Sequence, residues 1–386
     1  MVRILHASQK MNNKAIFKVD RRVKEHLSNL TQIALYITDN CNLRCEHCFY
    51  KPDIIFRHPN RELPLKTAIS LISTFKKLGA SKLTIIGGEP TLYGISKDWK
   101  PLLLLIEKAK DIGYEYVRID TNGQFNPSLL KKEKFKLLNE LSFSLDGPTL
   151  EINDLIRGEN SFLKCISNIR RAIKLGYRVD ITCCVHKELL KRDKNKMLYL
   201  ESMIFLAQNL GVKRINFHGL FKMGVPRDTW TNSLNLLVDS VDEWINVYKE
   251  IQDNIIKRKY TISIRLPLGF TTKEEFKKNL KYYAFCPAKI GERVIIHPNG
   301  IIRICSLMIG TPYGIARFYD NKIVWDESPT NELNVFKKDR YGYCPYQNQG
   351  KSKIYGHLIP LCISFKPGQE EYAWSNRLNW EKKKNN

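Results

Sequence analysis

Residues 32–225 alternate short apolar segments with amphipathic ones, and this alternation constrains the fold more than any other feature of the sequence. The apolar segments have the length of strands; they are QIALYIT (32–38), KLTIIGG (82–88), EYVRIDTNG (115–123), LSFSLDG (141–147), RVDITCCV (178–185) and KRINFHG (213–219). The segments between them show the 3.6-residue spacing of helices, and SLLKKEKFKLL (128–138) is predicted to be one of these helices. Six strand–helix repeats predict an α/β fold with parallel strands, open or curled into a partial (β/α)6 barrel.

The periodicity changes after residue 225, and this change predicts the domain organisation. Residues 1–31 form an N-terminal extension, and residues 32–225 form the barrel core. Residues 226–285 form a connecting helical segment. Residues 286–370 form a small region that contains cysteines, and residues 371–386 form a basic tail.

Length and composition fit a protein with a sizeable core, because the chain has 386 residues and 43% of them are hydrophobic. The longest purely apolar run covers residues 102–106, far short of the roughly 20 residues that cross a membrane. Charged residues interrupt the first 24 positions, so no signal peptide is visible. We therefore expect a soluble, cytoplasmic protein without membrane contact, in which ten cysteines indicate metal or redox chemistry more than disulfides.

The formal net charge of +24 has two interpretations. Lysines are scattered along the chain, which is typical of a solvated basic surface. The same charge would attract an anionic partner such as a nucleotide, a phosphorylated sugar or an acidic peptide. Nucleic-acid binding would need basic residues clustered with aromatic ones on one face, and the sequence does not show that clustering.

Polar or glycine-rich clusters follow the first four predicted strands. They are Cys41–Cys48, Gly87–Pro90, Thr121–Gly123 and Ser144–Gly147. Because the carboxyl ends of parallel strands meet at one edge of a sheet, we expect these clusters to meet at one rim. The sequence therefore predicts an active site there.

The first cluster, CNLRCEHCFY (41–50), carries three cysteines within eight residues. Thiolates suit zinc or iron–sulfur clusters. A structural zinc ion needs four ligands, and His47 is an awkward fourth because it is adjacent to Cys48. A four-iron cluster held by three cysteines leaves its fourth iron open to an exogenous ligand.

Cys41-x3-Cys45-x2-Cys48 after the first strand, together with GGEP (87–90) after the second, resembles the radical S-adenosylmethionine (SAM) superfamily over about residues 32–225. The resemblance implies a 4Fe–4S cluster whose open iron binds SAM. It also implies an electron donor such as flavodoxin or ferredoxin. The activity it implies is hydrogen abstraction from an unactivated carbon by a 5′-deoxyadenosyl radical.

The same resemblance assigns roles by position. The implied cluster ligands are Cys41, Cys45 and Cys48. The residues implied to contact or surround SAM are His47 near the adenine, Gly87, Gly88 and Glu89 at the amino group, Pro90 in the turn, Asn122, Ser144 and Asp146 at the ribose and carboxylate, and Arg157 of IRGENSF close to the cofactor.

A second cysteine set lies in the C-terminal region. CPAKIGERVIIHPNGIIRIC (286–305) resembles the opening of the auxiliary-cluster domains called SPASM and twitch, with HPNG as a hairpin turn. The implied ligands of one auxiliary 4Fe–4S cluster are Cys286, Cys305, Cys344 and Cys362. A structural zinc ion on the same four thiolates remains an alternative.

Alternation along residues 178–185 places Cys183 towards the helices and Cys184 towards the inside of the barrel. Cys184 is a candidate hydrogen-atom donor, the role that a thiol plays in radical epimerases; a buried, unreactive cysteine is the alternative. By the same alternation Asn216 and His218 face inward, where they contact substrate. Cys165 shares the apolar face of its helix and is interpreted as core.

The leading hypothesis is a radical SAM oxidoreductase or maturase-type enzyme. Its substrate is a ribosomally made peptide or a natural-product amino sugar or nucleoside, which it oxidises, cross-links or epimerises. The short segment before residue 32 argues against a separate leader-peptide domain. The alternative is a zinc-binding structural or nucleic-acid-binding protein, which would leave GGEP, TNG and SLDG at successive strand ends unexplained.

Overall fold

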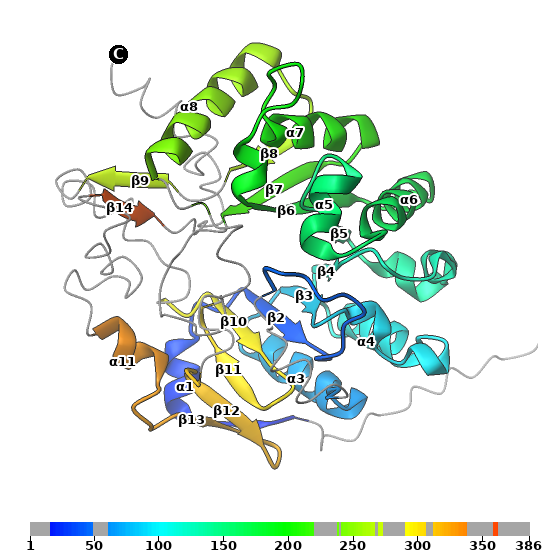
Figure 1. Ribbon diagram of the computed structural model, residues 1–386. Coiled ribbons are helices and arrows are strands. Elements are labelled where there is room, and N and C mark those ends of the chain that lie inside the picture. Colours follow the sequence, from blue (N-terminus) through cyan, green and yellow to red (C-terminus); the bar gives the residue numbers. More distant parts are fainter. Residues whose placement is uncertain are drawn as a thin grey trace, which may run out of the picture.

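A curled sheet of 12 strands organises the chain in the computed structural model (Figure 1). The structure describes residues 16–48, 61–219, 238, 241–266, 269–272, 290–305, 312–337 and 358–361. The strand order across the sheet is β1-β13-β12-β11-β10-β2-β3-β4-β5-β6-β7-β8. Its strands are β1 (Lys18–Val19), β2 (Gln32–Tyr36), β3 (Lys82–Ile86), β4 (Tyr116–Thr121), β5 (Glu140–Ser144), β6 (Val179–Val185), β7 (Arg214–Gly219), β8 (Ser263–Arg265), β10 (Arg293–Ile296), β11 (Ile301–Arg303), β12 (Ala316–Tyr319) and β13 (Lys322–Trp325).

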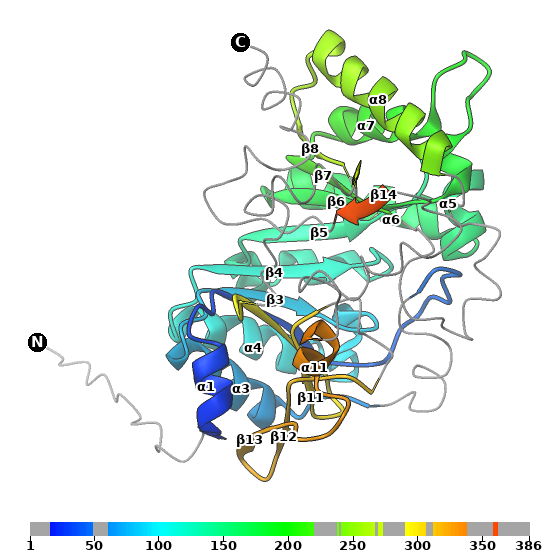
Figure 2. The same ribbon diagram turned by 90° about the vertical axis from the view of Figure 1, so that its left-hand side faces the viewer.

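Strands β2 to β7 lie side by side in chain order, and every neighbouring pair is parallel. Strand β8 continues the parallel run beyond β7. The sheet curls without closing in the described part of the chain (Figure 2). The prediction of an α/β fold with a partial parallel barrel is confirmed.

Helices cover the outer face of this curl (Figure 1). They are α1 (Arg21–His26), α3 (Leu65–Lys77), α4 (Lys100–Asp111), α5 (Leu150–Arg157), α6 (Ser161–Lys174), α7 (Tyr199–Leu210), α8 (Val241–Arg258) and α11 (Glu332–Lys337). Helix α3 buries Leu71, Ile72 and Phe75, which recur on one face as the sequence predicted. Burial of such side chains stabilises the fold by about 1.5–3 kcal/mol each.

Residues 128–138 differ from the prediction of a single helix. The chain forms two 3₁₀ helices here, η3 (Pro127–Lys131) and η4 (Glu133–Leu137). Lys132 between them has an extended backbone (φ −71°, ψ 126°), which interrupts the α-helical hydrogen bonds. The break still lets Leu129, Leu130 and Phe135 reach the core. Burial of apolar side chains therefore overrides the helical propensity of this lysine-rich segment.

The C-terminal part of the chain extends the same sheet. Strand β10 pairs in parallel with β2, and β11, β12 and β13 follow as antiparallel neighbours. Strand β1 of the N-terminal segment pairs with β13. The predicted HPNG hairpin is confirmed: β10 and β11 are antiparallel, and Gly300 has a φ of +87°. A separate two-stranded sheet joins β9 (Gly269–Thr272) and β14 (Leu358–Leu361). The predicted domain boundaries stay a prediction.

The two faces of the parallel strands differ in polarity. The helix-covered face carries Ile119, Phe143, Ile181 and other fully buried apolar side chains. The opposite face, which lines the inside of the curl and is called the lumen here, carries polar side chains. On this face Asp120 is paired in register with Ser142 of the neighbouring strand, and Asp180 is paired with Arg214.

Glu140 is the centre of an ion-pair network on the lumen face. It is 1% exposed, and it pairs with Arg118 at 3.3 Å, Arg178 at 3.1 Å and Arg214 at 3.0 Å. Burial alone would raise the pKa of Glu140, but the guanidinium groups of Arg214 and Arg118 and the Tyr116 hydroxyl hold it below its usual range. The carboxylate is therefore charged, and it fixes three guanidinium groups.

We predict that Glu140→Gln lowers the free energy of unfolding by about 3 kcal/mol, because it removes the buried negative charge that Arg118, Arg178 and Arg214 share. Urea unfolding of the purified protein measures the change. Glu133→Gln is the control, because Glu133 makes an exposed pair with Lys136, and its loss costs below about 1 kcal/mol. Equal destabilisation by the two variants would contradict this role of Glu140.

Candidate active site

The loop with the three cysteines leaves the end of β2 at the carboxyl rim of the parallel strands. Cys41 and Cys48 pack against a small apolar cluster formed by Tyr36 and Ile295. All three cysteines are half-buried free thiols, and the Cys48 N–H donates to the Cys45 carbonyl at 3.1 Å. Burial raises the pKa of Cys41 to about 12, and it also raises the pKa of Cys45. Thiols whose pKa is raised by burial lose their proton readily only beside a cation.

Donor groups point at two of the three sulfur atoms. The Leu43 N–H lies 3.5 Å from Cys41 Sγ, and Asn122 Nδ2 lies 3.7 Å from the same atom. Arg157 Nη1 lies 4.0 Å from Cys45 Sγ. Hydrogen bonds and positive charge at the sulfur atoms stabilise thiolates in metal sites.

The glycine pair of GGEP lets the cysteine loop approach the end of β3. The Gly88 N–H donates to the Thr38 carbonyl at 2.7 Å, and the Glu89 N–H donates to the Asn40 carbonyl at 2.6 Å. A Cβ atom at Gly87 would lie 2.6 Å from the Thr38 carbonyl oxygen, and one at Gly88 would clash with Asn40. The absence of side chains here is therefore a packing requirement.

Glu89 is fully buried, and its carboxylate joins the ends of β3 and β4. It accepts from the Thr91 N–H at 3.0 Å, the Thr121 hydroxyl at 2.7 Å and the Asn122 N–H at 2.7 Å. Asn122 in turn donates to Asn42 Oδ1 at 2.8 Å, so the chain of bonds continues into the cysteine loop. Glu89 therefore positions Asn122 and the loop.

Asp146, at the end of β5, is a second buried carboxylate with contacts to several elements. It pairs with Arg157 Nε at 2.6 Å, lies 3.3 Å from His47 Nε2 and accepts from the Cys184 N–H at 2.7 Å. Its backbone carbonyl lies 2.7 Å from His186 Nε2. Protein groups enclose this carboxylate, so we interpret Asp146 as a positioning residue for the cysteine loop, α5 and β6.

The charges around Asp146 follow from burial and proximity. Burial lowers the pKa of His47 to about 4, so the imidazole is neutral near pH 7. Burial alone would raise the pKa of Asp146, but the Arg157 guanidinium holds it below its usual range. The charged pair is therefore Asp146 and Arg157, and Arg157 carries positive charge towards Cys45.

The structure brings the other predicted rim residues to the same place. Pro90 is buried at the start of the 3₁₀ helix η1 (Pro90–Leu92). Ser144 is half-buried, and its carbonyl lies 3.7 Å from Cys165 Sγ. Cys165 is buried in the core, as predicted.

Cys184 lies on the lumen face of β6, next to this rim. Its sulfur atom lies within 4.8 Å of ligand atoms of His47 and Asp146. The thiol is half-exposed, whereas neighbouring Cys183 is fully buried on the helix-covered face. The alternation predicted for this strand is therefore confirmed. Burial and the nearby Asp146 carboxylate raise the pKa of Cys184, so it stays a thiol.

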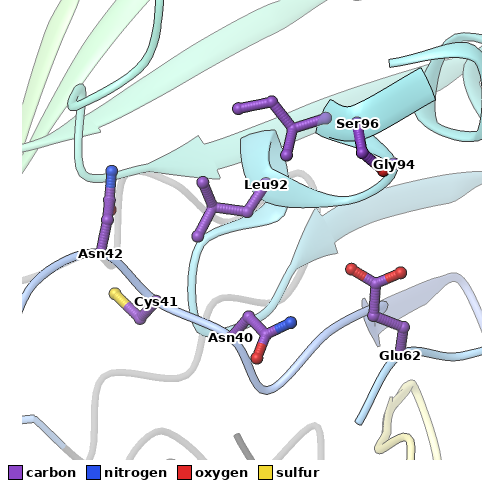
Figure 3. Close-up of a pocket in the computed structure, with 8 residues that line it drawn as sticks. Asn40, Cys41, Asn42, Glu62, Leu92, Gly94 and Ser96 are labelled. Atoms are coloured by element: carbon purple, nitrogen blue, oxygen red, sulfur yellow. The ribbon is translucent and has the colours of Figure 1, made fainter. Parts of the chain in front are cut away.

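A pocket of about 360 Å³ opens on the Cys41 side of the loop. Figure 3 shows Cys41 between Asn40 and Asn42, with Leu92 and Gly94 on the facing segment. Glu62 and Ser96 complete the polar part of the lining. Half-buried Cys41 thus borders an open space that both polar and apolar side chains line.

The donor set fits the cluster that the sequence predicts. Three thiols share one loop, and N–H groups or a guanidinium point at two of the sulfur atoms. His47, a possible fourth ligand, turns its Nε2 to Asp146. Three thiols with surrounding donors suit an iron–sulfur cluster better than a closed zinc site.

Only one of the four predicted auxiliary ligands lies within the described residues. Cys305 is buried just after β11, while Cys286, Cys344 and Cys362 lie outside that range. The fully buried Glu332 carboxylate accepts from the Ile304 N–H at 2.6 Å, and burial raises the pKa of Glu332 to about 7. The auxiliary site therefore stays a prediction.

Sequence reasoning missed Asn42 and His186, which support the cysteine loop and Asp146, and Glu332, which contacts the segment before Cys305. Asn42 donates to the Gln124 carbonyl at 2.9 Å, in addition to its bond with Asn122. An asparagine next to a ligand cysteine was the available signal for Asn42. Glu332 and His186 come from distant segments, and nothing in the sequence marks them.

Comparisons with known proteins agree with this geometry. Residues 35–193 match the family described as the Radical SAM superfamily. GTP 3′,8-cyclase of Actinobacillus succinogenes is 31% identical over 185 residues, which cover 46% of this chain and 52% of that relative. Probable GTP 3′,8-cyclase of Saccharolobus solfataricus is 24% identical over 277 residues, which cover 72% of this chain and 82% of that relative. The chain thus spans about half the length of the bacterial relative.

A solved structure shares the fold. The protein described as native anSMEcpe with bound AdoMet and Cp18Cys peptide matches with a TM-score of 0.59 and 17% sequence identity. The match covers 92% of this chain and 99% of that chain.

Fold and site together define an α/β partial barrel whose carboxyl rim carries a three-cysteine ligand loop and a glycine-rich turn. More particularly, residues 35–193 match the model of the Radical SAM superfamily. Within the described part of the chain, no helix is both long and apolar enough to cross a membrane.

We predict that Asp146→Asn weakens metal retention by the cysteine loop about 10–100-fold, because loss of a group that orients metal ligands has effects of this size. The variant keeps the shape of the side chain but loses the charge that pairs with Arg157. Release of iron to a ferrous chelator under anaerobic conditions measures the effect. Asp154→Asn is the matched control, because the Asp154 carboxylate accepts hydrogen bonds from Ser161 and Phe162 and not from the described residues of the cysteine loop. Equal release from both variants would rule out this role of Asp146.

Proposed function

We propose that this protein is a radical SAM enzyme. In this proposal Cys41, Cys45 and Cys48 hold a 4Fe–4S cluster, and SAM binds at its open iron. When bound and reduced, these cofactors supply a 5′-deoxyadenosyl radical that removes a hydrogen atom from an unactivated carbon of the substrate. The observation that carries the proposal is the convergence of the cysteine loop with the glycine turn and the strand ends at one rim, inside a segment that matches the superfamily.

The protein's own residues supply position and electrostatics. Glu89 holds Asn122 and the cysteine loop, and Asp146 holds His47 and Arg157. The half-buried backbone at Gly87 and Gly88 is proposed to receive the amino group of SAM, and Ser144 and Asn122 to border its ribose and carboxylate. His47 is proposed to lie beside the adenine.

The proposed redox partners follow from the same chemistry. An electron donor such as flavodoxin or ferredoxin would reduce the cluster. One auxiliary 4Fe–4S cluster on Cys286, Cys305, Cys344 and Cys362 would accept an electron from the substrate radical or shape the pocket. The relatives named GTP 3′,8-cyclase support a small nucleoside-type substrate.

A peptide substrate is the second candidate. It is supported by anSMEcpe, a protein of the same fold whose structure holds a bound peptide, although a match at 17% identity speaks for the fold alone. Oxidation, cross-linking and epimerisation remain the possible outcomes of the proposed hydrogen abstraction.

The central test is the composition and activity of the cysteine variants. Anaerobically purified protein should contain about eight irons per chain, and replacing Cys41, Cys45 and Cys48 together by alanine should leave about four. Cleavage of SAM to 5′-deoxyadenosine with dithionite, followed by liquid chromatography, should then disappear. Cys305→Ala should lower iron in the same way but leave cleavage measurable. Zinc in place of iron, or cleavage by the triple variant, would overturn the proposal.

Cys184 is proposed as a hydrogen-atom donor. Its S–H hydrogen would pass to a carbon radical, and the resulting thiyl radical would regain the thiol with one electron from an iron–sulfur protein and one proton. In D₂O the thiol carries deuterium, so SAM cleavage without substrate should place deuterium in 5′-deoxyadenosine if Cys184 lies within reach. Mass spectrometry should show less deuterium for Cys184→Ala and no change for Cys183→Ala, whose side chain faces the helices. Equal labelling in all three proteins would remove Cys184 from this role.

A further inference from the structure

The lumen wall formed by β6, β7 and β8 carries polar side chains, and apart from Cys184 the ones named here have no role in the proposed cofactor site. Cys184 pairs in register with His218, and Asn216 pairs with Arg265. Paired positions in a parallel sheet point to the same face. These four side chains therefore form one polar surface inside the curl, below the rim that carries the cysteine loop.

His218 shows that this surface faces open space. Its side chain is solvent-exposed, yet its crowded surroundings lower its pKa. The charges that act on it include Arg118 and Asp120 on β4 and Arg293 on β10, which are distant strands of the curl. A group that keeps exposed surface while charged groups surround it lies in a solvent-accessible space inside the fold.

Asn216 is the clearest unused group on this wall. It is 8% exposed, and its side chain makes no hydrogen bond with any residue in the described ranges. Its register neighbour Thr182 is already paired, because its hydroxyl lies 3.0 Å from that of Ser142. A polar ligand group that hydrogen-bonds this largely buried amide would therefore be stabilised by it.

The lumen also holds a guanidinium group, that of Arg293, without an ion pair in the described residues, although its charge acts on the Glu332 carboxylate. Arg118 and Arg214 are paired with Asp120, Glu140 and Asp180. Arg293 on β10 forms no ion pair with any residue that the structure describes, and its Nε atom is buried without a hydrogen-bond partner. An unpaired guanidinium in partly buried surroundings attracts phosphate or carboxylate groups strongly.

Building on the proposed function, we propose that the lumen binds a small phosphorylated substrate, with Arg293 at its phosphate and Asn216 and His218 at its other polar groups. Arginine presents a planar pair of donors that matches phosphate oxygens. An amide side chain can both donate and accept hydrogen bonds. Arg265, on the next strand, adds positive charge beside Asn216. A nucleotide and a sugar phosphate share this chemistry.

Binding to the full chain, loaded with iron and kept anaerobic, tests the proposal by isothermal titration calorimetry. The probes are GTP, guanosine, glucose 1-phosphate and a short polyglutamate peptide. We expect GTP or glucose 1-phosphate to bind, and guanosine to bind at least about tenfold more weakly than GTP. Binding of GTP alone indicates a nucleotide, and binding of the sugar phosphate alone indicates a sugar substrate.

Two variants locate the site. Arg293→Gln and Asn216→Ala should each weaken binding of the phosphorylated probe about tenfold or more. Arg293→Gln removes a charge that forms no ion pair within the described residues, so the fold should tolerate it. Arg171→Gln on the exposed face of α6 is the matched control and should change nothing. The inference is overturned if neither phosphorylated probe binds, if Arg293→Gln and Arg171→Gln bind alike, or if the peptide binds more tightly than both.

SAM cleavage with dithionite, measured without any probe, separates this inference from the proposed function. A chain that cleaves SAM but binds no phosphorylated probe overturns the inference about the lumen alone. A chain that binds the probe through Arg293 but never cleaves SAM supports the lumen site and counts against the proposed radical chemistry.

Discussion

The site depends on a sheet that helices cover on one face only. Apolar side chains such as Phe143 and Ile181 fill the covered face, and polar side chains occupy the lumen. Charges in the lumen are partly removed from water, so each must find a partner or remain costly. Glu140 supplies that partner for three arginines at the base of the lumen. The same constraint concentrates the reactive groups at the one open end of the strands.

Two buried carboxylates at the rim, Glu89 and Asp146, hold the carboxyl ends of the strands together. Glu89 after β3 accepts the Asn122 N–H at the end of β4, and Asp146 after β5 accepts the Cys184 N–H on β6. The carboxylate at the end of one strand thus accepts a hydrogen bond from the backbone of the next strand, at the point where the backbone hydrogen bonds between the two strands end. Each carboxylate also connects to the cysteine loop, Glu89 through Asn122 and Asp146 through His47. A fixed loop needs less reorganisation when it binds a metal.

Much of the architecture could be predicted because periodicity and strand-end chemistry are local signals. The strand segments, the parallel barrel, the HPNG turn and the inward placement of Cys184 all follow from spacing within a few residues. The break at Lys132 could not be predicted, because it depends on which side chains the finished core accepts. Pairing of β10 with β2 joins residues about 260 positions apart, and no local pattern reports it. The burial of Asp146 was missed for the same reason, since its partners come from three distant segments.

The net charge of +24 and the lumen arginines act at different stages of binding. Exposed lysines are screened within about 8 Å at physiological salt, so they raise the rate of encounter with any anion and discriminate little between them. A guanidinium inside the curl is screened less and has a fixed direction, because its strand is held by neighbours on both sides. Discrimination between a phosphorylated small molecule and an acidic peptide therefore has to come from the lumen, where both charge and shape are restricted. The basic surface alone is compatible with either partner. Arg293, which forms no ion pair within the described residues, and the largely buried Asn216 are what favour the small molecule.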